Sequence, residues 1–147
     1  MKIIAITTPK AVPEDAYIIA RLLDKGVDIV HLRKPESSVE ECRELLSALD
    51  RVYRERIVVH DYPELFYEFA LRGVHLNRNV KVLPEGYNGS KTRSCHSLEE
   101  VVRYKDECDY LLLSPIFDSI SKKYLLEVAM KEAEEERKRR EEEEAVK

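Results

Sequence analysis

The sequence predicts an α/β domain of parallel β/α repeats that is followed by a charged helix at the C-terminus. Short aliphatic and β-branched runs alternate with amphipathic segments over residues 2–113. Glycine and proline stand between many of these segments, where they end one element and begin the next. Every residue from 134 to 144 is charged, which is typical of a solvated helix with little to bury.

Six segments are predicted to be strands, and they cover residues 2–7, 28–33, 56–60, 74–76, 93–96 and 109–113. The first segment, KIIAIT, is expected to be a buried strand because it is a short β-branched run. Six strands with about five crossovers allow either an open doubly wound sheet or a barrel. The spacing of the segments does not separate these two architectures.

The helix boundaries are predicted from prolines, glycines and capping residues. Pro13 begins the first helix and Gly26 ends it. Two helices are expected to open with a capping box, in which a serine and a glutamate three residues later bond to each other's backbone N–H groups. The pairs are Ser38 with Glu41 and Ser97 with Glu100. The remaining segments are expected to be a helix over residues 63–73, a loop over 77–92 and a polar loop over 114–122.

Composition argues against several classes of protein. The 147 residues carry 25 Lys and Arg against 29 Asp and Glu, a net charge of −4 that argues against a nucleic-acid-binding face. The three cysteines, Cys42, Cys95 and Cys108, form no C-x-x-C pair, so we expect reduced thiols in a cytoplasmic protein. No apolar run approaches the roughly 20 residues that span a bilayer, and the N-terminus does not have the pattern of a signal peptide.

Polar side chains gather where the predicted strands end, which is the edge at which parallel β/α folds bind ligands. Over strands two to five these residues are His31, Arg33, Lys34, His60, Asp61, His75, Asn77, Ser94 and His96. All four histidines of the chain belong to this set. A single strand-end histidine is also explained as a hydrogen-bonded rim residue, and Arg33 as a partner of Asp61, so the set is more informative than its members.

The polar loop after the sixth strand offers two hydroxyls and a cation, from Ser119, Ser121 and Lys122. These groups suit a phosphate or pyrophosphate, although serine-rich loops are also ordinary turn chemistry. A magnesium site is only weakly supported, because Mg²⁺ prefers carboxylates. Asp61 is the only carboxylate at the ends of strands two to four.

Five motifs resemble the thiamine phosphate synthase/TenI family of (β/α)8 barrels in thiamine biosynthesis. They are HLRKPE (31–36), VHDY (59–62), GVHLN (73–77), RSCHSLEE (93–100) and DYLLLSPIFDSISK (109–122). The resemblance implies a small phosphorylated thiazole or pyrimidine as ligand. Synthases join a pyrimidine pyrophosphate to a thiazole phosphate with Mg²⁺, whereas the TenI branch isomerises a thiazole carboxylate phosphate by moving a proton.

The synthase motif on strand two is Gln-x-Arg-x-Lys. Here His31, Arg33 and Pro35 occupy those positions, so the family's pyrophosphate-binding lysine is missing, although Lys34 is adjacent. Asp61 matches one of the two aspartates that bind Mg²⁺ in the synthases. The second aspartate is replaced by Val80.

The His-Leu-Arg pattern at 31–33 and the Ser-Cys-His-Ser-Leu-Glu pattern at 94–99 look like the TenI branch. That likeness implies His96 as the catalytic acid and base, and a histidine suits proton transfer near neutral pH. The loop from Ser114 to Lys122 looks more like the synthases. Both branches therefore stay open.

The family continues for two more β/α units after the loop that ends at Lys122, and glycine-rich turns in those units hold the phosphate. We therefore expect residues 1–122 to form an incomplete TIM-type barrel, and residues 123–147 to form a helix that is foreign to the family or designed. Such a chain is expected to be inactive and to dimerise through its open edge strands. The alternative is a non-enzymatic or engineered scaffold that dimerises or covers its open edge with the C-terminal helix.

Overall fold

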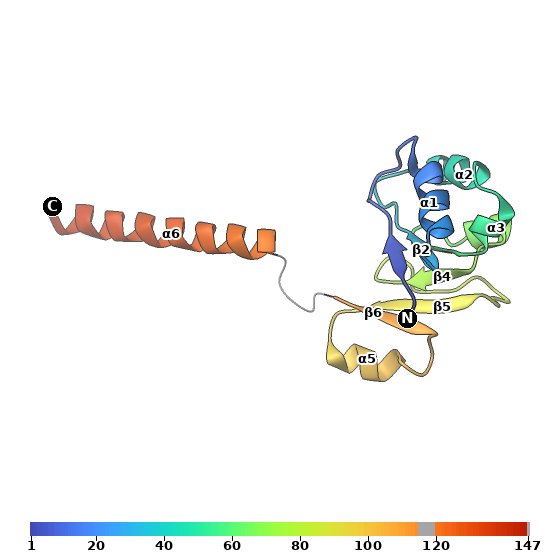
Figure 1. The fold of residues 1–147 in the computed structure, drawn as a ribbon. Helices are drawn as coiled ribbons and strands as arrows, with labels where there is room; N and C mark the ends of the chain where they lie inside the picture. The colour runs from blue at the N-terminus through green and yellow to red at the C-terminus, as the bar shows by residue number, and fades with distance from the viewer. Residues whose placement is uncertain (115–119, 147) are drawn as a thin grey trace. The chain divides into compact units, whose positions relative to one another are not determined.

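The computed structural model describes residues 1–114 and 120–146, and Figure 1 shows its ribbon. The chain divides into two compact units, residues 1–113 and 114–147. The first unit contains β1 (Ile4–Ile6), α1 (Asp15–Asp24), β2 (Ile29–Leu32), α2 (Val39–Ser47), α3 (Arg51–Arg54), β3 (Ile57–Val59), α4 (Leu65–Phe69), β4 (Gly73–Leu76), β5 (Ser90–Cys95), α5 (Leu98–Tyr104) and β6 (Tyr110–Leu113). The second contains α6 (Ile120–Val146).

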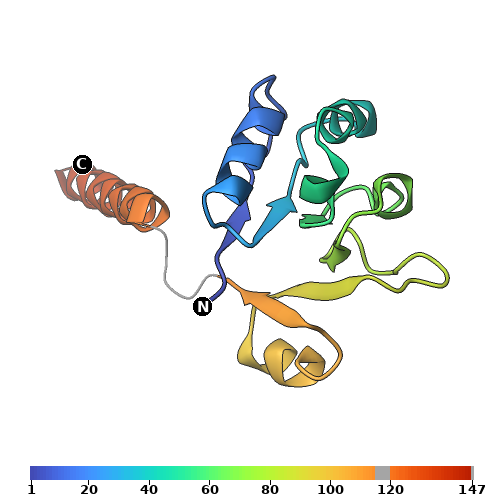
Figure 2. The same cartoon turned by 45° about the vertical axis from the view of Figure 1, so that its right-hand side comes forward.

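The six strands of the first unit form one parallel sheet in the order β1-β2-β3-β4-β5-β6. A doubly wound sheet reverses its strand order at a switch point, and this order never reverses. The sheet curls as part of a barrel wall, with helices around its outer side (Figure 2). The predicted α/β fold of parallel repeats is confirmed, and of the two architectures the incomplete barrel is the one observed.

The two faces of the sheet differ in chemistry because successive side chains of a strand point to opposite faces. Apolar side chains of the outer face form the core with α1, α2 and α4. Members of that core are Ile19, Leu23, Val30, Leu32, Leu45, Leu46, Ile57, Val59, Leu65, Val74 and Leu76. The residues between them in β2 and β4, His31 and His75, belong to the other face. The outer face therefore forms the apolar core, and the inner face carries the two histidines beside apolar residues such as Val58.

The prediction that the first strand is buried was wrong. Ile3 is 49% exposed and Ile6 is 52% exposed. Within the described residues, β1 pairs only with β2 and β6 only with β5. A strand at the edge of a sheet has a neighbour on one side only, so part of its apolar surface stays in solvent. The expected dimerisation through these edges stays a prediction.

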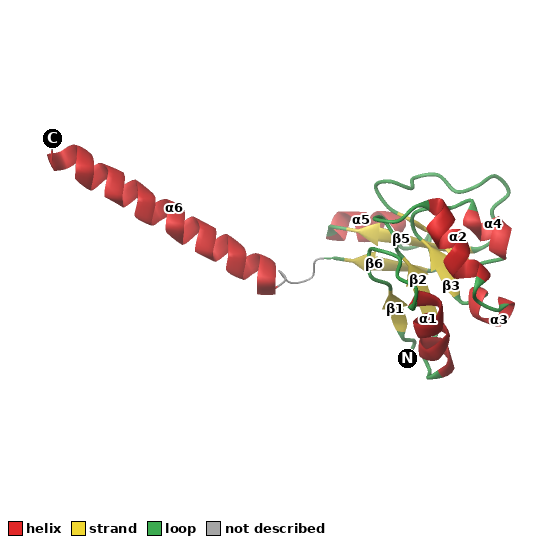
Figure 3. Ribbon diagram, turned by 90° about the horizontal axis from the view of Figure 1, so that it is seen from above, coloured by secondary structure: helices red, strands yellow, loops and turns green. Residues whose placement is uncertain are grey.

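Several predicted boundaries shift in the structure. Residues 77–89 lead from β4 to β5 without a helix, seen as a long green loop in Figure 3, and β5 begins at Ser90 rather than Arg93. The helix predicted over 63–73 is shorter, because Ala70 takes a left-handed φ of 52° just after α4. α3 was not predicted. α6 begins at Ile120, so the predicted polar loop ends earlier than Lys122.

The predicted helix ends can be compared with the hydrogen bonds found. The capping box of Ser38 with Glu41 is confirmed, since both reciprocal bonds are present. Gly26, with φ of 113°, ends the first helix as predicted. At α5 only half of the predicted box forms: Ser97 accepts from the N–H of Glu100, but the Glu100 carboxylate accepts from the N–H of His96 at 2.9 Å. Among residues 1–114 and 120–146, no helix has both the length and the apolar character to cross a membrane.

Candidate functional site

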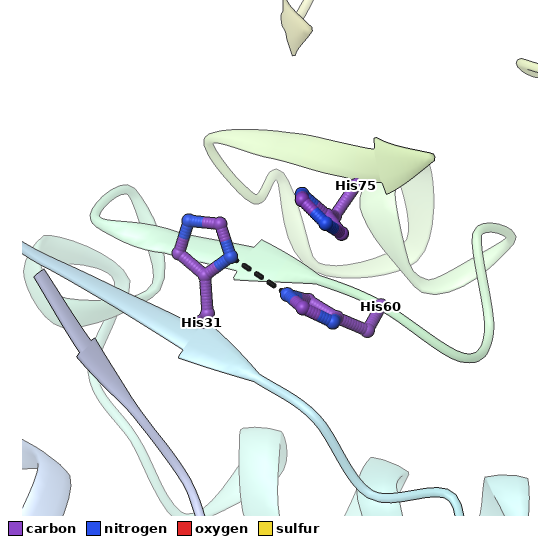
Figure 4. A group of neighbouring side chains, drawn as sticks. All are labelled: His31, His60 and His75. Atoms are coloured by element: carbon purple, nitrogen blue, oxygen red, sulfur yellow. Dashed lines mark hydrogen bonds between the residues drawn. The ribbon is translucent and has the colours of Figure 1, made fainter. Parts of the chain in front are cut away.

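Three histidines from neighbouring strands meet on the inner face of the sheet (Figure 4). His31 lies in β2, His60 directly follows β3, and His75 lies in β4. His31 and His75 are fully buried and His60 is 4% exposed. The Nδ1 atom of His31 lies 2.6 Å from Nε2 of His60, and the rings of His60 and His75 stack with centroids 4.1 Å apart. We call His31, His60 and His75 the histidine cluster.

Hydroxyl groups of β5 and β6 surround the histidine cluster. Nε2 of His31 lies 2.5 Å from the Tyr110 hydroxyl. The two ring nitrogens of His75 lie 2.7 Å from Oγ1 of Thr92 and 2.6 Å from Oγ of Ser94. A hydroxyl can both donate and accept, so each partner can match either tautomer of its histidine.

Burial sets the protonation of these groups because it disfavours a charged imidazole. It lowers the pKa of His31 to about 4, of His75 to about 3 and of His60 to about 2. For His60 the neighbouring cations Arg33, His31 and His75, when charged, lower the pKa further. Burial also raises the pKa of Tyr110 to about 12. At neutral pH the cluster is therefore uncharged, and its nitrogens are available as hydrogen-bond or metal-binding groups.

A cavity of about 200 Å³ lies beside the carboxyl ends of β4 and β5. It brings together three residues of the predicted site, Asn77, Ser94 and His96. Its lining also carries four cationic side chains and a single carboxylate; the remaining lining residues are Arg78, Lys81, Arg93, Glu100, Arg103 and Tyr104. Such an excess of positive charge favours an anionic ligand. We call this space the basic cavity.

The residues of the basic cavity are held in different ways. Asn77 shapes the loop after β4, because its Oδ1 accepts from the N–H groups of Asn79 at 2.8 Å and Val80 at 2.9 Å. The guanidinium carbon of Arg93 lies 3.8 Å from the centre of the Tyr104 ring, a cation–π contact that fixes this side chain against α5. His96 follows β5 directly, and its side chain is exposed. Its imidazole can therefore reach a ligand bound in the cavity.

The other predicted residues of strands two and three lie apart from the lining of the basic cavity. Arg33 is exposed, and its backbone bonds with the Thr7 hydroxyl in both directions at 3.0 Å. Lys34 is fully buried, and its ammonium group lies 2.8 Å from the Asp15 carboxylate and 3.1 Å from the Lys10 carbonyl. An ammonium group committed in this way stabilises the packing of α1, so Lys34 has no free donor surface for a pyrophosphate.

The family described as thiamine monophosphate synthase matches residues 3–140. The chain belongs to this family. The match of the thiamine monophosphate synthase family extends past Lys122 into α6, where we had expected the resemblance to end. Comparison with curated protein sequences gave no significant match.

Two solved structures illustrate the likeness to thiamine phosphate pyrophosphorylases. The enzyme from Bacteroides thetaiotaomicron is 39% identical, with a TM-score of 0.75, and the match covers 90% of this chain and 67% of that one. The enzyme from Pyrococcus furiosus is 22% identical with a TM-score of 0.64, which supports the fold alone, and the match covers 79% and 61% of the two chains. The chain therefore spans about two thirds of the length of these relatives.

The Mg²⁺ that synthases of this family use does not fit the residues present. One oxygen of Asp61 accepts the backbone N–H of Lys34 at 2.6 Å, so part of this carboxylate is already engaged. Val80, at the place of the second aspartate, is buried and apolar. Mg²⁺ needs oxygen ligands in near-octahedral geometry. Within the described residues, the ends of β2–β4 supply a single carboxylate, and one of its two oxygens already accepts a hydrogen bond. This is too few oxygen ligands for Mg²⁺.

The predicted phosphate-binding residues Ser119, Ser121 and Lys122 do not belong to the unit that contains the basic cavity. Ser119 lies outside the described residues. Ser121 and Lys122 belong to the first turn of α6 rather than to a loop. Their role in binding a phosphate stays a prediction.

Prediction from the sequence missed several residues of this edge of the sheet. Thr92 and Tyr110 contact the histidine cluster, and Arg78, Lys81, Arg93 and Arg103 line the basic cavity. One signal was present in the sequence, because Thr92, Ser94 and His96 recur every second residue and so share a face of one strand. The cations carry no such signal, since two of them lie in a loop, one lies in a helix and only Arg93 lies in the strand.

Proposed function

We propose that this chain binds the phosphorylated thiazole of thiamine biosynthesis in the basic cavity and moves a proton on it, as the TenI branch of the family does. The observation that carries the proposal is that an exposed histidine, His96, lines one cavity with Asn77, Ser94 and four cationic side chains. This combination offers a proton carrier beside an anion-binding surface. It departs from the expectation that an incomplete barrel is inactive, because four cations of the basic cavity can hold a phosphate in place of the family's glycine-rich turns. Of the two branches, it favours the tautomerase over the synthase.

The chemistry asks three things of these residues. The cations hold the phosphate and carboxylate of the ligand by charge-assisted hydrogen bonds. Hydroxyl and amide groups of Ser94 and Asn77 orient the ring. The imidazole of His96 takes a proton from one ring position and returns it at another, a transfer that side chains of its kind accelerate by roughly 10²- to 10⁴-fold. No metal ion takes part in this sequence, which agrees with the poor fit of Mg²⁺ to the residues at the strand ends.

The experiment compares ligand binding with turnover. Thiazole carboxylate phosphate is added to the wild-type chain and to His96→Gln, with Arg51→Gln as a matched control in an exposed ion pair away from the cavity. Calorimetry measures binding and NMR of the ligand measures isomerisation. We expect all three proteins to bind, and wild type and Arg51→Gln to isomerise at least about 100-fold faster than His96→Gln.

Three results would overturn parts of the proposal. Binding without isomerisation by the wild type would leave a ligand-binding scaffold, the alternative function of this chain. Condensation of a pyrimidine pyrophosphate with a thiazole phosphate in the presence of Mg²⁺ would make it a synthase. Absence of binding would remove the basic cavity as the site.

We also propose a homodimer formed by pairing of the edge strands. The exposed Ile3 and Ile6 of the β1 segment support it, because an apolar edge is a ready template for another chain. Light scattering is expected to give twice the mass of one chain. Replacing Ile6 by lysine should return the monomer, and a monomeric wild type would refute this part.

A further inference from the structure

We propose that the histidine cluster is a binding site for one divalent transition-metal ion, with Zn²⁺ as the type ion. Each of His31, His60 and His75 offers one ring nitrogen, and these three atoms all lie within 4.8 Å of one another (Figure 4). The ligands come from three adjacent parallel strands, so the backbone fixes their spacing. This site does not depend on the proposed function of His96, although Ser94 borders both the cluster and the basic cavity.

The distances between the nitrogens are close to what an ion requires. Zinc–nitrogen bonds of about 2.0–2.1 Å in a tetrahedron place the nitrogens about 3.3 Å apart. Nδ1 of His31 and Nε2 of His60 are 2.6 Å apart and must separate slightly, whereas the widest spacing of 4.8 Å must close. Small changes of the side-chain torsions that move each ring by roughly 0.8 Å would bring both spacings to the value that the ion requires. Three protein ligands leave the fourth position of the tetrahedron open for a water molecule or another small ligand.

The chemistry of the cluster selects the class of ion. Neutral imidazole nitrogens bind Zn²⁺, Cu²⁺, Ni²⁺ and Fe²⁺ well, whereas Mg²⁺ and Ca²⁺ prefer oxygen. In the cluster, His31 and His60 share one hydrogen bond and His75 bonds to the hydroxyls of Thr92 and Ser94. An ion would replace the bonds of three of these ring nitrogens with bonds to itself, so the buried nitrogens would stay satisfied. The cluster is therefore suited to a transition-metal ion and not to Mg²⁺.

The groups behind the histidines match those that support metal ligands. A metal-bound histidine donates the N–H of its other nitrogen to an acceptor, which fixes its tautomer. Nε2 of His31 is placed to donate to the Tyr110 hydroxyl, and the ring nitrogen of His75 that does not bind the ion has Thr92 or Ser94 as its partner. When the ion enters, His31 and His60 stop sharing a hydrogen bond and each keeps one N–H on the side away from the ion. The change is a tautomer shift that releases no proton.

The test uses the full chain without an affinity tag, first treated with a chelator. Zn²⁺ is titrated against a chromophoric competitor, and Co²⁺ is used for its visible absorption. We expect one ion per chain, and loss of at least about tenfold in affinity for His31→Gln, His60→Gln and His75→Gln. His96→Gln and Cys108→Ser are the controls, because they remove an exposed histidine and a half-buried thiol outside the cluster. Tyr110→Phe should weaken binding by about 10-fold or more, as loss of a supporting hydrogen bond does.

A second measurement keeps the proposal open to refutation if a cluster variant does not fold. Nitrogen-15 spectra of the wild-type imidazoles should show one nitrogen in each of three histidines shifted by Zn²⁺, and none shifted by Mg²⁺. The proposal is overturned if the wild type takes up no stoichiometric Zn²⁺. It is equally overturned if binding is lost in His96→Gln or Cys108→Ser and kept in the cluster variants, or if the spectra show no imidazole shifted by Zn²⁺.

Discussion

The Nε2 atom of His31 in β2 lies 2.5 Å from the hydroxyl of Tyr110 in β6, although the two residues are 79 positions apart. β2 and β6 are not neighbours in the sheet, so this bond crosses the inner side of the curl. It joins the second strand to the last strand of the first unit. The bond thus helps to hold the curvature that brings the histidine cluster together.

Tyr110→Phe removes this bond and leaves a buried ring nitrogen of His31 without that partner. We expect the free energy of unfolding to fall by about 1–3 kcal/mol, the cost of an unsatisfied buried polar group. Urea denaturation measures it on metal-free protein. Tyr17→Phe is the matched control, since Tyr17 is 69% exposed and its change should be within about 0.5 kcal/mol. Equal effects of the two substitutions would contradict the prediction.

The histidine cluster should make metal-free protein less stable as the pH falls below about 6.5. The pKa of His31 is about 4, of His75 about 3 and of His60 about 2 in the folded chain, against 6.5 for an ordinary histidine. Between those values the unfolded chain binds protons that the folded chain does not, so acid favours unfolding. The stabilisation is fully present above pH 6.5 and is lost progressively as the pH falls through the folded-state pKa values of about 4, 3 and 2.

Denaturation curves at several pH values in the presence of a chelator measure this dependence. His31→Gln should make the slope between pH 6.5 and 5 shallower by about one proton. A free energy of unfolding that does not change between pH 7 and 5 would rule out three buried neutral histidines.

Asp15→Ala should be strongly destabilising because it leaves the Lys34 ammonium group buried without its counter-charge. The two groups are 2.8 Å apart, and the Lys34 side chain has no exposed surface. Breaking a buried ion pair costs about 3–5 kcal/mol. Thermal and urea unfolding measure the loss. Glu55→Ala breaks the exposed pair of Glu55 with Arg51 and should cost less than about 1 kcal/mol, so comparable losses would argue against a buried pair.

Gly73→Ala should separate β4 from β5. A Cβ at Gly73 would lie 2.3 Å from the carbonyl oxygen of Ser90, and backbone atoms cannot rotate away as a side chain does. We expect a loss of about 1–3 kcal/mol, as for other overpacked sites. Ser90→Ala is the control at the same contact. It removes a buried hydroxyl that has no hydrogen-bond partner, so it should be neutral or slightly stabilising.

Features that depend on residues close together in the sequence were predicted well, and features that depend on distant strands were not. The β-branched runs of β2 and β3 and the capping box at Ser38 are local patterns, and they were found correctly. β5 was placed too short because Ser90, Lys91 and Thr92 look like a loop, yet β4 pairs with them. β1 looked buried because its residues are apolar, but its place at the sheet edge depends on the other strands.

The same distinction applies to the site. Ligand-binding parallel folds place their sites at strand ends, which was enough to choose Ser94, Asn77 and His96, and they share one cavity. Lys34 was chosen for the same reason, because it also follows a strand. Its side chain pairs instead with Asp15, which belongs to a helix that no local sequence pattern connects with Lys34. The histidine cluster depends on the curl of the whole sheet, which strand spacing alone does not determine.

Each strand of the sheet pairs with the strands before and after it in the chain, so the wall grows in the order in which the ribosome makes it. Every β/α unit can settle on its predecessor as soon as it leaves the exit tunnel, without waiting for a distant partner. His31, His60 and His75 all precede β6 in the chain. In a chain that folds in this order, the bond of Tyr110 to His31 is therefore the last of the contacts around the three imidazoles to form.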